Sequence, residues 1–197
     1  MSKRSLLDRF RSGVLRQDHV CPWWLAFTFD NPLRRFLHDP EKMLVGLVKP
    51  GMTVADIGCG MGYFSIAMAR MVAPKGKVLS VDIQQEMLDL LLKRARKQGV
   101  PEVIEARLIP RDDIGIREPL DFVLAFWMVH ETGDVLRFLR QVASVLKPGA
   151  SMLIAEPRMH VSARTFQQIL KKAFDAGFRV NEGPPIRMSR SAILIKP

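Results

Sequence analysis

Three glycines at alternate positions, Gly58, Gly60 and Gly62, join a short apolar run to a segment with helical periodicity. Glycine lacks a Cβ atom, so such a loop turns sharply and its backbone approaches a ligand closely, while the following helix presents free N–H groups. Asp56 precedes the glycines, and a second apolar run ends in a carboxylate at Asp82. A carboxylate in that place accepts hydrogen bonds from both hydroxyls of a ribose. These residues predict a nucleotide-binding site.

The glycine spacing separates two kinds of nucleotide site. In the dinucleotide fingerprint G-x-G-x-x-G, a third glycine would stand at position 63 after Gly58 and Gly60, but this chain has Tyr63 there. A nicotinamide enzyme is therefore the least favoured interpretation.

A second group of reactive side chains follows the apolar run 120–126 and comprises Phe126, Trp127, His130 and Glu131. Ligands of open α/β sheets bind outside the carboxyl ends of the strands, so these residues are placed to border a substrate. The imidazole of His130 titrates near neutrality, and it could take a proton from the substrate or orient it. The alternative is a structural histidine that hydrogen-bonds the loop before the next helix.

Aromatic residues are concentrated near the N-terminus, in the proline-bounded segment 21–32. Trp23, Trp24 and Phe29 are predicted either to form a lid over the substrate or to pack the N-terminal arm onto the rest of the chain. His19 and Cys21, near the start of this segment, could suggest a metal, but no second cluster of ligands accompanies them, so no metal site is predicted.

The elements that position these residues follow from the hydrophobic period. Apolar runs alternate with amphipathic stretches, which predicts an α/β fold with a doubly wound, mostly parallel sheet and helices on both faces. The predicted strands are 52–57, 77–82, 102–108, 120–126 and 150–155, and the predicted helices are 62–73, 84–98, 133–146 and 163–176. A further helix is expected from Asp39 to Val48, with Asp39 as its N-cap and Pro40 at its first position.

The last two predicted strands, near 178–180 and 191–195, complete a seven-stranded, Rossmann-like sheet. Parallel neighbours need a crossover of roughly a dozen or more residues, usually helical, and the connection through Gly183 leaves no room for a helix. We therefore expect an antiparallel C-terminal hairpin on an otherwise parallel sheet.

These motifs, taken in order, resemble those of the class I S-adenosylmethionine-dependent methyltransferases, and in particular the small-molecule "type 11" methyltransferase domain. The first motif of that family is similar to residues 54–62, its second to 78–82 and its late strand to 146–157. The resemblance covers about residues 40 to 197 and includes the terminal hairpin.

The resemblance implies S-adenosylmethionine as cofactor. The glycine loop would pass under its methionine part, and Asp56 would help to hold its amino group. Asp82 would bind the ribose, Ile83 would lie against the adenine, and Phe126 would contribute to the cofactor site. Trp127 and Glu131 are assigned to the substrate.

The resemblance leaves two candidates for the residue that reads the adenine amino group. Many relatives carry an acid where this chain has Pro110. Asp112 or Asp113 could replace it, and the alternative is that both acids cap the loop or face solvent.

Composition bounds the remaining expectations. The chain of 197 residues suits one methyltransferase domain, 39–197, after an N-terminal helical and aromatic extension, 1–38, that could act as a lid. The sequence shows no run of about eighteen apolar residues, no signal peptide and only two cysteines, which predicts a cytoplasmic protein without a membrane span.

A net charge of +10 suggests an anionic partner, and residues 158–197 alone carry eight Lys or Arg against Asp175 and Glu182. Aromatic residues are almost absent from that region, so nucleic acid is possible but not favoured. The leading prediction is in-line methyl transfer to an unidentified small molecule. The alternatives are an RNA or protein methyltransferase and a non-catalytic regulatory module that binds S-adenosylmethionine. The oligomeric state is left open.

Overall fold

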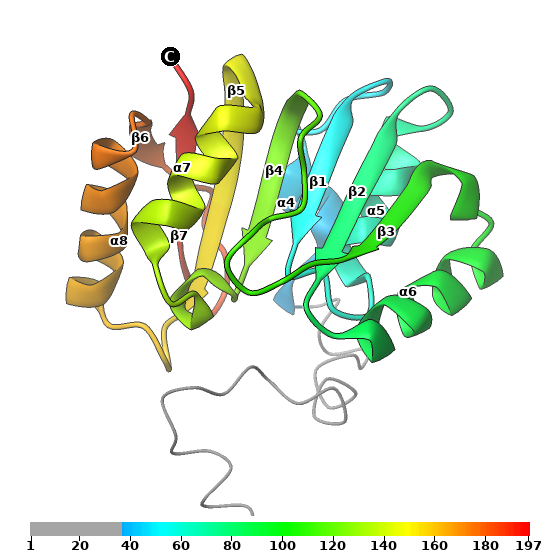
Figure 1. Ribbon diagram of the computed structural model, residues 1–197, viewed down its shortest axis with the longest axis horizontal. Helices are drawn as coiled ribbons and strands as arrows, with labels where there is room; N and C mark the ends of the chain where they lie inside the picture. Colours follow the sequence, from blue (N-terminus) through cyan, green and yellow to red (C-terminus); the bar gives the residue numbers. More distant parts are fainter. Residues whose placement is uncertain (1–36) are drawn as a thin grey trace, which may run out of the picture.

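The computed structural model describes residues 37–197, and its seven strands form one sheet of order β3-β2-β1-β4-β5-β7-β6 (Figure 1). The strands are β1 (Thr53–Ile57), β2 (Lys77–Asp82), β3 (Ile104–Leu108), β4 (Leu120–Phe126), β5 (Leu146–Pro157), β6 (Arg179–Glu182) and β7 (Ser189–Ile195). The helices are α4 (Pro40–Leu44), α5 (Tyr63–Val72), α6 (Gln85–Lys97), α7 (Val135–Val145) and α8 (Ala163–Asp175), with 3₁₀ turns η1 (Pro101–Val103) and η2 (Val129–Glu131).

The pairing confirms the predicted topology. Strands β1 to β5 are parallel, whereas β7 runs antiparallel to both β5 and β6, with Leu153 opposite Ile193. Strand β1 pairs with β2 on one side and with β4 on the other, so the direction of winding reverses there. Ligands of such sheets bind beyond the carboxyl ends of the strands at this reversal.

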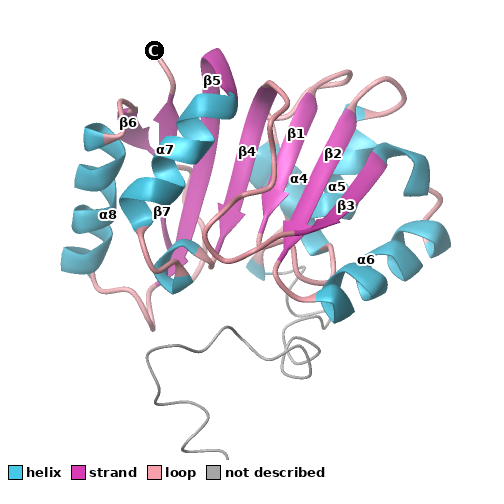
Figure 2. Cartoon of the chain, in the orientation of Figure 1, coloured by secondary structure: helices cyan, strands magenta, loops and turns pink. Residues whose placement is uncertain are grey.

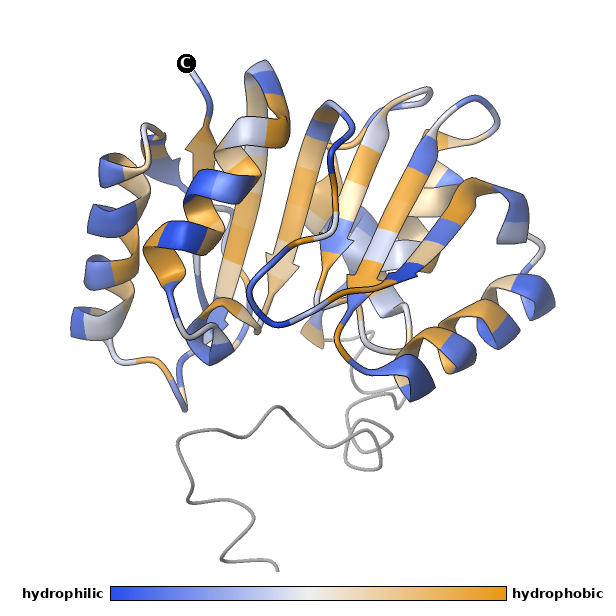
Figure 3. Ribbon diagram, in the orientation of Figure 1, coloured by the Kyte–Doolittle hydropathy of each residue, from blue (hydrophilic) through white to orange (hydrophobic). Residues whose placement is uncertain are grey.

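Helices cover both faces of the sheet (Figure 2). Side chains alternate across a strand, so Val54 packs in the core under α4, α5 and α6, while its neighbour Ala55 packs in the core under α7 and α8. Figure 3 shows hydrophobic residues along the strands and alternating hydrophilic and hydrophobic positions along α6 and α8. Helices on both faces are thus confirmed.

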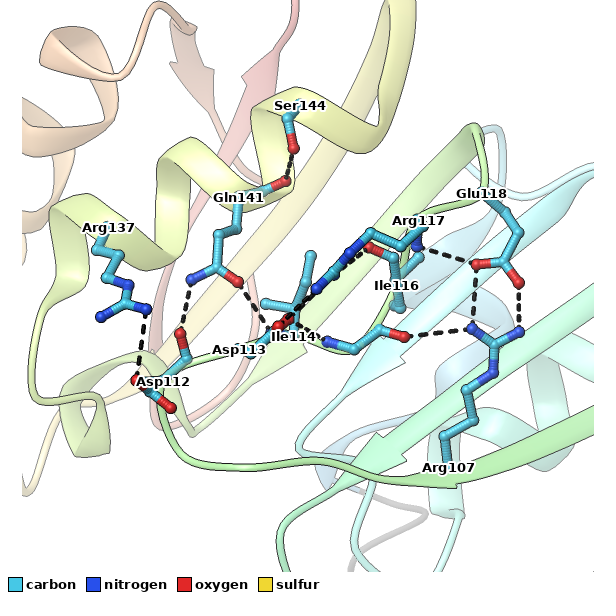
Figure 4. A network of polar contacts seen from close by, with 11 residues as sticks. Arg107, Asp112, Asp113, Ile114, Ile116, Arg117, Glu118, Arg137, Gln141 and Ser144 are labelled. Atoms are coloured by element: carbon cyan, nitrogen blue, oxygen red, sulfur yellow. Dashed lines mark hydrogen bonds and ion pairs between the residues drawn. The ribbon is translucent and has the colours of Figure 1, made fainter.

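The connection between β3 and β4, residues 109–119, contains no helix, in agreement with the sequence prediction. It crosses the α7 side of the sheet and contributes Ile114 and Ile116, which are 3% and 0% exposed, to that core (Figure 1). Gln141 of α7 holds the connection in place, because it accepts from the Ile114 N–H at 3.0 Å and donates to the Asp112 carbonyl at 2.9 Å (Figure 4).

Several predicted boundaries were wrong, and two of them by as many as four residues. The helix from Asp39 ends at Leu44 instead of Val48, because Val45 leaves the helical region (ψ 130°) and Gly46 has φ +79°. Its start is confirmed, since the Asp39 carboxylate accepts from the N–H groups of residues 41 and 42. Strand β5 is longer than 150–155, because Leu146 already pairs with Leu120 of β4. Within the described residues, no helix is long and apolar enough to cross a membrane.

Candidate functional site

The glycine loop lies between β1 and α5. Gly58 and Cys59 both donate backbone hydrogen bonds to the Val81 carbonyl, at 2.9 and 3.1 Å, so the loop is fastened to β2. Gly62 has φ +80°, and a Cβ atom there would lie 2.6 Å from Cγ of Leu91. The backbone conformation and the close approach of α6 together require glycine at this position.

Gly58 is constrained in the same way from the opposite side. Its φ is +71°, and a Cβ atom would lie 2.9 Å from Cγ of Met128, which follows β4. Gly60, between them, has φ +51°, and a Cβ atom there would have no neighbouring heavy atom within 4 Å. The loop is therefore packed at its two outer glycines and open at Gly60, which suits a cradle for a ligand.

Asp82 ends β2 against this loop. Its Oδ2 accepts from Gly60 N and its Oδ1 from Gln84 N, both at 2.9 Å. Burial raises the pKa of the carboxyl group, and the backbone hydrogen bonds oppose that shift. Each carboxylate oxygen keeps a further lone pair, so the predicted contact with a ribose stays a prediction that this geometry allows. Ile83 follows directly and is half-buried.

Asp56 has a structural partner in addition to its predicted role. Its Oδ2 accepts from Ser65 Oγ at 2.5 Å, and the residue is 2% exposed. This bond ties the end of β1 to the first turn of α5, so it steadies the glycine loop from below. Contact with the cofactor's amino group stays a prediction.

Asp112 and Asp113 lie on the 109–119 connection, near α7 (Figure 4). The Asp112 carboxylate is exposed and lies 3.4 Å from Arg137 Nη2. Asp113 accepts from the Gly115 N–H at 2.8 Å and from Arg117, and these interactions lower its pKa to about 2, the Arg117 hydrogen bond most of all. Asp113 therefore caps the loop, as the alternative interpretation expects, and adenine binding by Asp112 stays a prediction.

Aromatic side chains gather beyond β4. The rings of Phe126 and Trp127 stack with centroids 5.2 Å apart, and His38 meets both of them edge-on. Trp127 has φ +60°, an uncommon conformation for a large residue, and two bonds hold it there. Its backbone N–H donates to the Ala155 carbonyl at 2.7 Å and its Nε1–H to Ser189 Oγ at 2.8 Å.

His38 connects this aromatic group to the glycine loop. Its carbonyl accepts from the Tyr63 hydroxyl at 2.8 Å, and its Nε2 lies 2.9 Å from the Arg187 carbonyl. The predicted lid residues Trp23, Trp24 and Phe29 lie outside the described residues.

His130 and Glu156 face each other from two neighbouring strand ends. His130 Nδ1 lies 2.5 Å from Oε2 of Glu156, whose side chain is fully buried, while the His130 side chain is 22% exposed. Burial lowers the pKa of His130, but the hydrogen bond and charge of Glu156, aided by Glu131, outweigh it, so the pKa is raised. Glu131 itself lies at the surface.

Glu156 was not among the residues predicted for the site. It also accepts from the backbone N–H groups of Val129 and His130, at 3.0 and 3.3 Å. An available signal was a carboxylate at the end of an apolar strand, but its partner is distant in the sequence and becomes a neighbour only when β4 and β5 pair. The printed partner of the His130 ring is therefore Glu156 at the end of β5 and not the loop before α7, and a catalytic role for His130 stays a prediction.

A family model described as "Methyltransferase domain" matches residues 48–182, which include the glycine loop, Asp82 and His130. The chain belongs to this family. The match confirms the resemblance to class I S-adenosylmethionine-dependent methyltransferases.

Among solved structures, this methyltransferase domain is similar to a SAM-dependent methyltransferase from Aquifex aeolicus, with a TM-score of 0.80 and 26% identity over 90% of this chain and 100% of that one. It is 28% identical to a demethylmenaquinone methyltransferase of Symbiobacterium thermophilum over 64% of this chain and 49% of the relative. It is also 28% identical to a ubiquinone biosynthesis O-methyltransferase of Xanthomonas campestris over 76% of this chain and 59% of the relative. The methyltransferase domain therefore spans only about half of these two relatives.

Proposed function

We propose that this protein is an enzyme that transfers a methyl group from S-adenosylmethionine to a small molecule. The observation that carries the proposal is the closure of the glycine loop on Asp82, with Gly60 N 2.9 Å from Oδ2, at the sheet position where ligands bind in this fold. Membership of the methyltransferase-domain family supports the choice of cofactor.

The described residues fit such a cofactor. The backbone at Gly60 is open to a ligand, and Asp82 offers carboxylate oxygens to a ribose beside it. Asp56 and Ile83 belong to the same edge of the sheet, and Phe126 ends the adjacent strand β4. When bound, S-adenosylmethionine supplies a sulfonium methyl group, and the chain has to align the acceptor with it and exclude water.

The substrate class we propose is a small ring compound of the quinone or quinol type. Two relatives whose names refer to menaquinone and ubiquinone support this class. Trp127, which is partly exposed and stacks on the buried ring of Phe126, offers aromatic surface beyond β4, and Glu131 is exposed on the turn that follows. We include the N-terminal extension 1–38 as a lid over this substrate, with Trp23, Trp24 and Phe29 as its aromatic residues.

The experiment is a methyl-transfer assay with isotope-labelled S-adenosylmethionine and a panel of hydroquinones and phenols. Labelled methyl ether or ring-methyl product with at least one acceptor is expected. Calorimetry with S-adenosylhomocysteine is run in parallel. Tight binding without turnover of any acceptor would favour a regulatory module, and no binding would refute the proposal.

The alternative is an RNA or protein methyltransferase, for which the net charge of +10 is the one supporting feature and which the quinone-type relatives do not favour. Binding to RNA that weakens steeply as salt increases would support it, because cationic contacts to phosphate release counterions. Absence of binding at low salt would remove it.

We also propose that the protein is cytoplasmic. The free thiol of Cys59 is consistent with a reducing compartment.

A further inference from the structure

The side chain of Glu156 is the fully buried acid at the end of β5, and it reaches across to the turn η2 that follows β4. It accepts from three N–H groups of that turn: the Val129 and His130 backbone amides and the His130 ring. A carboxylate without such partners would be costly to bury, so the acid and the turn depend on each other.

The contacts determine which nitrogen of His130 carries the proton. A carboxylate only accepts hydrogen bonds, so Nδ1, 2.5 Å from Oε2 of Glu156, has to be the donor. In the neutral ring the proton is then on Nδ1, and Nε2, on the opposite side of the ring from Nδ1, has a free lone pair. The His130 side chain is 22% exposed, so it is not sealed from the surface.

The ring also lies on the same edge of the sheet as the glycine loop. Met128, two residues before His130, packs against Gly58 closely enough to exclude a Cβ atom. The strands that lead to the two sites are parallel neighbours, with Ile57 opposite Ala125. A substrate held beside the glycine loop would therefore border the turn that carries His130.

We propose that Glu156 is a positioning residue that holds His130 with its proton on Nδ1, so that Nε2 accepts the proton of a hydroxyl group on the methyl acceptor. This rests on the proposed function and narrows its substrate to an alcohol or phenol. The acceptor O–H bond breaks, its proton passes to Nε2, and the electron pair of the oxygen forms the bond to the methyl carbon. The methyl–sulfur bond breaks with its electron pair retained by sulfur.

The charge of the resulting imidazolium is balanced by its neighbours. Glu156 faces the ring from β5 and Glu131 from the same turn, and both favour the charged ring. His160, on the segment after β5, stacks on His130 with centroids 6.0 Å apart. A buried carboxylate that orients a histidine and stabilises its cation plays the same part in hydrolase triads.

The test uses nuclear magnetic resonance of the ¹⁵N-labelled full chain, which reports the tautomer and the pKa of each histidine without cofactor or acceptor. His130→Asn assigns the signals of His130. In the wild type we expect the Nδ1–H tautomer. In Glu156→Gln, whose amide can donate to Nδ1, we expect the Nε2–H tautomer and an apparent pKa lower by at least about 1. Glu156→Asp keeps the charge and should retain the Nδ1–H form.

The control is His160→Asn, which removes the stacked ring and should leave the His130 tautomer unchanged. An Nε2–H tautomer in the wild type would overturn the proposal, and so would an unchanged tautomer in Glu156→Gln. If Glu156→Gln does not fold, the wild-type and Glu156→Asp spectra still decide. Loss of S-adenosylhomocysteine binding together with the expected tautomers would refute the proposed function and leave the positioning of His130 intact.

Discussion

The backbone N–H of Gly60 donates to Oδ2 of Asp82 across 2.9 Å, which joins the loop after β1 to the end of β2. The carboxylate thus helps to fix the conformation of the loop. The same side chain offers its remaining lone pairs at the edge of the sheet where ligands of this fold bind.

Replacement of this carboxylate should weaken cofactor binding. For Asp82→Ala we expect the affinity for S-adenosylhomocysteine to fall by about tenfold to a hundredfold, the range for lost hydrogen bonds to a charged group. Isothermal titration calorimetry measures it. Asp175→Ala, at the exposed end of α8, is the control and should bind like the wild type. Equal affinities of the two variants would contradict the assignment.

Alanine substitutions at two glycines of similar backbone conformation distinguish the cost of backbone strain from the cost of a steric clash. Gly62 and Gly99 have φ of +80° and +71°, but only at Gly62 would a Cβ atom meet a neighbour, Leu91. Gly99→Ala should lower the free energy of unfolding by about 1–2 kcal/mol. Gly62→Ala should cost about 1–3 kcal/mol more through overpacking. Urea unfolding compares them, and equal losses would show that Leu91 relaxes without cost.

Glu156→Gln should slow methyl transfer without weakening cofactor binding. We expect kcat to fall by about a hundredfold or more, the lower range for loss of general base catalysis. The affinity for S-adenosylhomocysteine should stay within about twofold, because Glu156 contacts η2 and not the glycine loop. Steady-state kinetics with an acceptor found in the panel, together with calorimetry, provide both values. A parallel loss of affinity would indicate collapse of the site instead.

The folding stability should depend on pH through His130. Its pKa is raised above the ordinary 6.5, so the folded state binds the proton more tightly than the unfolded state. The resulting stabilisation is fully present below the ordinary value and is lost as the pH rises through the raised one. Unfolding curves should therefore show a gap between wild type and His130→Gln that is larger near about pH 5.5 than near about pH 9.

The pairing of His130 with Glu156 accounts for the larger stability difference at low pH. The unfolding curves of wild type and His130→Gln are therefore compared again with Glu156→Gln present in both. There the larger gap at low pH should be lost or reversed, because burial then lowers the pKa of His130 with only the charge of Glu131 opposing it. A gap that remains larger at low pH to the same extent without Glu156 would assign the raised pKa to another group.

Gln141 should matter more for stability than the arginine one turn away. It supplies both hydrogen bonds that hold residues 112 and 114 of the β3–β4 connection on α7 (Figure 4). Gln141→Ala leaves the Ile114 N–H without that acceptor and should cost about 1–3 kcal/mol. Arg137→Ala removes an exposed ion pair with Asp112 and should have a smaller effect. Thermal unfolding distinguishes them, and equal effects would contradict the ranking.

Spacing within short stretches was sufficient to predict the glycine loop and the topology of the sheet. The alternate glycines at 58, 60 and 62 predict the sharp turn that φ values of +71°, +51° and +80° display. The short connection before β7 predicts an antiparallel hairpin, because a parallel neighbour needs a longer crossover. These features depend on residues close in the chain, and local periodicity reports them directly.

The ends of helices and the partners that lie far apart in the sequence could not be predicted from local spacing. The helix at Asp39 stops at Leu44 because Val45 and Gly46 adopt a turn that the apolar pattern does not encode. Asp113 caps the loop at Gly115, a choice that the sequence leaves open between two adjacent acids.

Glu156 shows why local spacing does not predict contacts between distant residues. In the sequence it is an acid at the end of an apolar strand, separated from His130 by a helix and most of a strand. The pairing of β4 with β5 places Phe126 opposite Ala155 and so sets the carboxylate against the turn after β4. Local spacing thus establishes the glycine loop, whereas the histidine–carboxylate pair exists only because strand register brings distant residues together and burial leaves the acid no solvent to bind.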